Sequence, residues 1–160
     1  MSNVFSGSEI VEMAVEIEKN GRDFYNSAAL VLKDKNIKDI FKHLASQEEK
    51  HIKVFEKILS GVKKYEPIEA YTDEYFGYIK ALSEEYVFTK KKKGKEIAKT
   101  VKDGKRAVEL GLSFERDSIL FYYEMKNFVP ESERNIIDGL MKEEQAHLRK
   151  LSLLRKRCYA

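Results

Sequence analysis

The sequence contains the pattern Glu-x-x-His twice, at Glu48–His51 and at Glu144–His147. In an α-helix, residues three apart share one face and lie about 4.5 Å apart along the axis, so the carboxylate and the imidazole can bind the same small cation. A single Glu-x-x-His is common in charged helices. Here, however, the two copies use two of the three histidines in the chain. They therefore predict a metal site to which two helices contribute.

Each motif lies within a stripe of apolar residues spaced by three and four, which is typical of a helix that buries one face. The stripes comprise Phe41, Leu44, Phe55 and Ile58 around the first motif, and Ile137, Leu140, Leu151 and Leu154 around the second. A glutamate buried in such a stripe is very costly unless it is paired or neutralised, so we expect a positive charge beside it. Glu49 and Glu143 fall outside the stripes and are expected to face solvent.

An internal repeat adds two glutamates to the predicted site. Residues 14–25 align with residues 111–122, which matches Glu18 with Glu115, and both glutamates lie in apolar stripes of the same spacing. The candidate metal ligands are therefore Glu18, Glu48, His51, Glu115, Glu144 and His147. The alternative is a metal-free core of Glu–His hydrogen bonds, which would leave four buried carboxylates poorly compensated.

Four carboxylates and two imidazoles suit two divalent cations, because four negative charges balance two such ions. This mixed oxygen and nitrogen set favours iron, with manganese or zinc as alternatives, and it offers no thiolate that would select copper. The spacing leaves open which glutamates bridge the ions. Analogy with other dimetal bundles favours Glu48 and Glu144 as bridges, with Glu18 and Glu115 bound to one ion each.

The composition predicts one domain over residues 1–160, since 42% apolar and 36% charged residues suit a chain with a substantial core. A net charge of +3 is too small to indicate nucleic-acid binding. No apolar run reaches the roughly 20 residues of a membrane span, and the N-terminus lacks a signal-peptide pattern. The single Cys158 excludes an internal disulfide. We therefore expect a cytoplasmic protein that binds neither nucleic acid nor membrane.

Apolar periodicity predicts four long helices, at about residues 7–33, 37–60, 103–128 and 130–157. Ser6 and Glu9 form a capping-box pattern at the start of the first helix, and Asp103 is expected to cap the third. Short, long and short connections between these helices predict an all-α four-helix bundle with one crossover.

The predicted crossover, residues 62–102, contains short helical segments near 73–85 and 96–102. Its first part is acidic and rich in aromatic residues, which we expect to pack onto the bundle or to form a homodimer contact. Its later part is basic and includes the run Lys90–Lys93. We interpret this run as a solvated connection, with a binding patch for an anionic partner as the alternative.

These motifs together resemble the rubrerythrin-like branch of the ferritin-like diiron proteins. The resemblance covers almost the whole chain and rests on Glu18-x-x-Gly21-Arg22-x-x-Tyr25, Glu48-x-x-His51, Glu115 with Phe121-Tyr122, and Glu144-x-x-His147. It implies a ferritin-like bundle with two iron ions. It also implies that Tyr25 and Tyr122 hydrogen-bond the carboxylates, with simple core packing as the alternative.

The same resemblance implies a diiron oxidoreductase active in oxidative stress, which reduces hydrogen peroxide or dioxygen. An external rubredoxin- or flavin-type reductase would supply the electrons, because one cysteine cannot build the four-cysteine iron centre usual in rubrerythrins. Ser118 also stands where rubrerythrins place an additional carboxylate, which favours a more symmetric site and a ferroxidase as the alternative. A non-catalytic dimetal stress protein is the second alternative.

Overall fold

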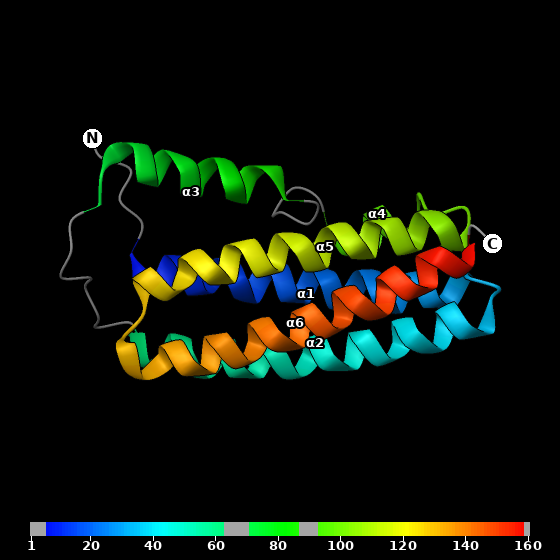
Figure 1. Ribbon diagram of the computed structural model, residues 1–160, viewed down its shortest axis with the longest axis horizontal. Coiled ribbons are helices and arrows are strands. Elements are labelled where there is room, and N and C mark those ends of the chain that lie inside the picture. The colour runs from blue at the N-terminus through cyan, green and yellow to red at the C-terminus, as the bar shows by residue number, and fades with distance from the viewer. Residues whose placement is uncertain (1–5, 63–70, 87–92, 159–160) are drawn as a thin grey trace.

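The computed structural model describes residues 6–62, 71–86 and 93–158, which are almost entirely helical and include no strand. Four long helices form a bundle (Figure 1): α1 (Gly7–Val31), α2 (Lys35–Val62), α5 (Gly104–Met125) and α6 (Glu131–Cys158). The shorter elements are α3 (Asp73–Glu85), α4 (Gly94–Ala98) and the 3-10 turn η1 (Lys126–Phe128). The predicted all-α, ferritin-like four-helix bundle is confirmed, whereas the assignment of residues 1–160 to one domain stays a prediction.

The long helices form two antiparallel hairpins, α1 with α2 and α5 with α6 (Figure 1). Because α2 and α5 run in the same direction, the chain between them has to travel the length of the bundle. On this path α3 packs against α5 and α4 packs against α1. Helix α3 has the expected bounds, while α4 begins and ends earlier than the expected 96–102. Residues 90–92 of the lysine run lie outside the described residues.

The helix starts follow from local capping. The Ser6 hydroxyl accepts a hydrogen bond from the Glu9 backbone nitrogen at 3.2 Å, and the Ser6 nitrogen donates to the Glu9 carboxylate at 3.1 Å. This confirms the predicted capping box of α1. Asp103 caps α5 as expected, because its Oδ1 accepts from the Arg106 nitrogen at 2.8 Å.

The turn between α1 and α2 is placed slightly earlier than predicted. Helix α1 ends at Val31 rather than near 33, and α2 begins at Lys35 rather than 37. Asp34 accounts for the second difference, since its Oδ1 accepts a hydrogen bond from the Ile37 nitrogen at 3.1 Å. An aspartate in this position satisfies one of the free N–H groups at a helix start and so favours an earlier first turn.

Two glycines let neighbouring helices approach α1 closely. A Cβ atom on Gly94 would collide with the carbonyl oxygen of Asn20, so α4 reaches the backbone of α1 only with glycine at this position. A Cβ atom on Gly21 would likewise collide with the Phe114 ring of α5. These contacts fix the distance of α1 from its neighbours one turn after Glu18.

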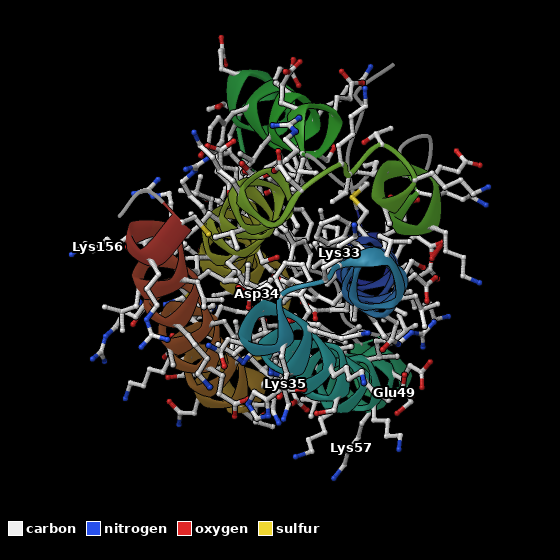
Figure 2. All side chains as sticks on the ribbon, turned by 90° about the vertical axis from the view of Figure 1, so that its right-hand side faces the viewer. Lys33, Asp34, Lys35, Glu49, Lys57 and Lys156 are labelled. Carbon is white, nitrogen blue, oxygen red and sulfur yellow. The ribbon has the colours of Figure 1, made fainter. Side chains whose placement is uncertain are left out.

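Charged side chains cover the outside of the bundle. Figure 2, seen along the bundle from the α1–α2 turn, shows Glu49 and Lys57 pointing away from the space between the helices. That space is filled by the apolar residues of the predicted stripes, including Phe41, Phe55 and Ile137, which are at most 1% exposed. None of the helices in the described part of the chain is both long and apolar enough to cross a membrane.

Candidate metal centre

All six predicted ligands lie together in the core of the bundle. Each of the four long helices contributes a glutamate from near its middle, and α2 and α6 each add a histidine. The four glutamates are fully buried, and the two histidines are at most 5% exposed. The apolar stripes explain this placement, because a residue spaced by three or four from buried apolar residues shares their face.

The ligand atoms form two groups that share two residues. One group comprises Glu18, Glu48, His51 and Glu144, and the other comprises Glu48, Glu115, Glu144 and His147. Within each group, one ligand atom from every residue lies within 4.8 Å of the others. This spacing allows four side chains to converge on one small cation in each group.

Each imidazole Nδ1 atom faces three carboxylates. The distances from His51 Nδ1 are 2.8 Å to Glu144, 3.2 Å to Glu48 and 3.5 Å to Glu18. The distances from His147 Nδ1 are 3.4 Å to Glu144 and 3.5 Å to both Glu48 and Glu115. The two halves of the repeat therefore surround their histidines in the same way.

The glutamates of the two motifs span both groups. Glu48 directs Oε2 toward His51 and Oε1 toward His147, and Glu144 directs Oε1 toward His51 and Oε2 toward His147. A carboxylate that offers one oxygen to each of two positions has the geometry of a bridge. The other two glutamates each face one histidine, as a ligand to a single ion would.

Nearly all of these ligand atoms are buried without a hydrogen-bond partner among the described residues. They are both carboxylate oxygens of Glu18, Glu48 and Glu144, Oε2 of Glu115, and Nδ1 of His51 and His147. An unsatisfied buried polar group costs about 1–3 kcal/mol, and more when it is charged. A cluster of such atoms aimed at common points fits a pair of divalent cations.

The carboxylates differ in their affinity for protons. Burial, reinforced by the charges of Glu48 and Glu144, raises the pKa of Glu18 and of Glu115 well above its usual range. Burial would also raise the pKa of Glu48 and Glu144, but close contacts with both imidazoles, and with Glu18 for Glu48 and Glu115 for Glu144, lower it. The two bridging candidates are thus the carboxylates that stay ionised most readily.

The histidines are shifted strongly toward the protonated form. Burial alone would lower the pKa of His147, but contacts with Glu115, Glu144 and Glu48 raise it to about 12. The pKa of His51 is raised by the corresponding carboxylates, again against the effect of burial. The four buried glutamates therefore strongly favour positive charge beside them, which either protons or metal cations can supply.

The two tyrosines implied by the family resemblance differ in their contacts. The Tyr25 hydroxyl donates a 2.7 Å hydrogen bond to Glu115 Oε1 and so orients this carboxylate. The Tyr122 hydroxyl is also fully buried, but it has no hydrogen-bond partner within the described residues. Its ring packs against Phe55, and neither oxygen of Glu18, the repeat counterpart of Glu115, has a hydrogen-bond partner among the described residues. Among the described residues, Tyr122 thus does not form the expected hydrogen bond to a carboxylate.

This difference gives a first prediction. Tyr25→Phe should lower the free energy of unfolding of the metal-free protein by about 1–3 kcal/mol, because it leaves Glu115 Oε1 buried without its donor. Tyr122→Phe is the matched control and should not lower the free energy of unfolding, because it removes a buried hydroxyl that has no hydrogen-bond partner among the described residues. Urea denaturation of the two variants measures both values, and equal losses would contradict the assignment.

Ser118, at the position where the resemblance implies an additional carboxylate, is not a metal ligand of either group. Its side chain is fully buried, and its hydroxyl donates to the backbone oxygen of Phe114 at 2.9 Å. The residue therefore satisfies its hydroxyl within its own helix and adds no charged ligand to either group.

One contact of the site could not be expected from the stripes. Glu143 is exposed, as predicted, but its Oε2 also accepts a 2.8 Å hydrogen bond from His51 Nε2. The predicted exposure of Glu143 is therefore confirmed, and the contact is additional, because α6 lies close enough to α2 for this side chain to reach the outer edge of the imidazole. Glu49 instead pairs with Arg22 at 2.7 Å. The sequence carries no signal for which helices adjoin at this point.

Comparisons with known proteins agree with this architecture. The rubrerythrin family model matches residues 9–155. A crystal structure from Thermotoga maritima, described as a ferritin-like diiron-carboxylate protein, has a TM-score of 0.76 and 26% identity over 95% of both chains. A hypothetical protein from Pyrococcus furiosus has the same fold, with a TM-score of 0.65 and 19% identity over 95% of this chain and 89% of that one. A search of curated proteins finds no significant match.

Proposed function

The chain belongs to the rubrerythrin family, and on this basis we propose that it is a diiron oxidoreductase that reduces hydrogen peroxide with electrons from an external donor. The observation that carries the proposal is the pair of buried ligand groups that share Glu48 and Glu144. Such a shared set is suited to holding two redox-active ions side by side. Manganese or zinc would fit the same ligands, but only a redox-active metal supports this reaction.

In this proposal the side chains position and balance the ions. Glu48 and Glu144 would each offer an oxygen to both positions, while Glu18 with His51 and Glu115 with His147 would complete the set of ligands for one position each. Tyr25 holds Glu115 in place, and the surrounding apolar residues exclude water from the site. When bound, the iron pair supplies the two electrons that cleave the O–O bond, and two protons are consumed to give two molecules of water.

We propose that the electrons come from another protein. The 160 residues contain one cysteine, so they cannot form the four-cysteine centre that would relay electrons to the site. A rubredoxin- or flavin-type reductase is the class of donor that the family membership suggests. The expected homodimer stays a prediction.

The second prediction tests this reaction. Protein loaded anaerobically with Fe(II) should be oxidised faster by hydrogen peroxide than by an equal concentration of dioxygen, measured by rapid-mixing absorbance. Repeated turnover should require an added reductase. The Glu48→Ala variant is the control, because it should lack the iron pair. Oxidation by dioxygen at the same rate or faster would contradict the peroxidase.

A ferroxidase is the second candidate, and Ser118 favours it, because the missing carboxylate makes the two ligand groups alike. The same experiment separates the candidates when Fe(II) is added in excess. A ferroxidase would oxidise the excess and retain Fe(III), whereas the proposed peroxidase would stop after its own site is oxidised. Failure of both oxidants would favour a non-catalytic dimetal protein.

A further inference from the structure

The two histidines differ on the side that faces away from the ligand groups. His51 directs Nδ1 into its group, and its Nε2 donates a hydrogen bond to Glu143 Oε2 at 2.8 Å. Glu143 reaches this nitrogen from α6, and its own side chain is 55% exposed. One of the two candidate histidine ligands is therefore connected through its outer nitrogen to a carboxylate at the surface.

The repeat places a different residue at the corresponding position. Glu143 directly precedes Glu144, and the residue that directly precedes Glu48 is Gln47, a neutral amide. The surroundings of His147 also include positive groups. After burial, the charges of Lys150, His147 and Lys50 lower the pKa of His43, which places His43 within electrostatic range of each of these groups. Within the described part of the chain, Glu143 lies 2.8 Å from His51 Nε2, whereas no carboxylate lies within ion-pair distance of His147 Nε2.

A carboxylate on the outer nitrogen affects a metal-binding histidine in two ways. It holds the tautomer with the proton on Nε2, which leaves Nδ1 free for the metal, and it fixes the orientation of the ring. It also makes the imidazole a stronger electron donor. Loss of such a partner typically lowers metal affinity about 10–100-fold, and an amide in its place supplies no negative charge.

We propose that Glu143 is a positioning residue that makes the two metal positions unequal, so that the first ion binds to the group of Glu18 and His51. This inference rests on the proposed two-ion site. The position of Glu115 and His147 then fills second and loses its ion first. When metal is scarce, the protein should hold a single ion on the His51 side.

Histidine signals can report the order of filling directly. The chain has only three histidines, so each imidazole can be followed by NMR in protein labelled with ¹⁵N-histidine. We would titrate the metal-free protein with Zn²⁺, which has no redox chemistry, and measure affinities in parallel by calorimetry. In the wild type, the His51 signals should shift during the first equivalent and the His147 signals during the second.

Three variants test the cause. Glu143→Gln should weaken the first binding step about 10–100-fold and make the His51 and His147 signals shift together. Gln47→Glu should reduce the difference in metal affinity between the two positions, because it should strengthen binding at the His147 position. Glu49→Gln removes the same charge beside Glu48 but from a side chain paired with Arg22. It should leave the order of filling unchanged.

The outcomes separate this inference from the proposed function. Wild-type protein that binds fewer than two Zn²⁺ ions would overturn the dimetal site itself. If two ions bind but His147 responds first, or if Glu143→Gln has no more effect than Glu49→Gln, the role of Glu143 is overturned and the dimetal site stands.

Discussion

Glu48→Ala is expected to abolish binding of both metal ions, whereas Glu18→Ala should abolish binding of only one ion. Glu48 faces both His51 and His147, while Glu18 faces His51 alone. Loss of a bridging carboxylate removes a ligand and a negative charge from both positions at once. Anaerobic loading with Fe(II), followed by gel filtration and metal analysis, should show a fall from about two ions per chain to fewer than one for Glu48→Ala.

Two comparisons make this result specific. Glu49→Ala removes the neighbouring carboxylate, which is 44% exposed and paired with Arg22, and should leave the metal content unchanged. Glu48→Gln keeps the size and polarity of the side chain, so metal loss in this variant reports the missing charge rather than misfolding, provided that its circular dichroism matches the wild type. Equal losses for Glu48→Ala and Glu18→Ala would show that Glu48 does not bridge.

Removal of the metal ions should lower the melting temperature by roughly 15–30 °C. A ligand present at a thousand times its dissociation constant stabilises the folded state by about 4 kcal/mol per site, and each kcal/mol corresponds to about 2–4 °C for a chain of this length. Calorimetry with and without a chelator measures the difference. An unchanged melting temperature would mean that the buried ligand groups do not depend on a cation.

The difference in melting temperature between the metal-bound and the metal-free protein should widen as the pH rises from 6 to 9. In the metal-free protein the pKa values of Glu18 and Glu115 are raised, so these carboxylates keep their protons in the folded state at a pH where the unfolded chain has released them. The stability of the metal-free protein therefore falls as the pH rises above the ordinary pKa of glutamate. The stability contributed by protonated His147 is complete below about 6.5 and is lost as the pH rises toward its folded pKa of about 12. Metal ions replace these protons and remove the dependence. A gap that narrows with pH would contradict this account.

The six candidate ligands could be assigned to the buried faces of their helices because helix register is encoded locally. The spacing of apolar residues assigns each side chain to a face, and the repeat selected Glu18 and Glu115 from helices that hold several other glutamates. The bridging geometry of Glu48 and Glu144 was suggested only by analogy, because it depends on which oxygen of each carboxylate faces which histidine. The contact of Glu143 with His51 was missed for a similar reason. It depends on the separation of α2 from α6, which no local pattern records.

The aromatic part of the crossover likewise combines a feature that the sequence predicts with one that it does not. Its expected packing on the bundle is confirmed for Tyr71, Tyr75 and Phe76, whose rings all contact Phe128. The hydrogen bond from the Tyr75 hydroxyl to Glu124 at 2.7 Å could not be predicted. Composition indicates that aromatic residues will be covered, but the partner of each hydroxyl depends on how α3 lies along α5.

The sharing of ligands between the two hairpins has a consequence for how such a site can arise. Each group takes three ligands from one hairpin and one from the other. Two identical copies of the α1–α2 hairpin, related by a two-fold axis, would supply the same four carboxylates and two imidazoles. Joining the copies into one chain frees each from the requirement to match the other. Gln47 opposite Glu143, and Gly21 opposite Ser118, are differences that a symmetric ancestor could not have held.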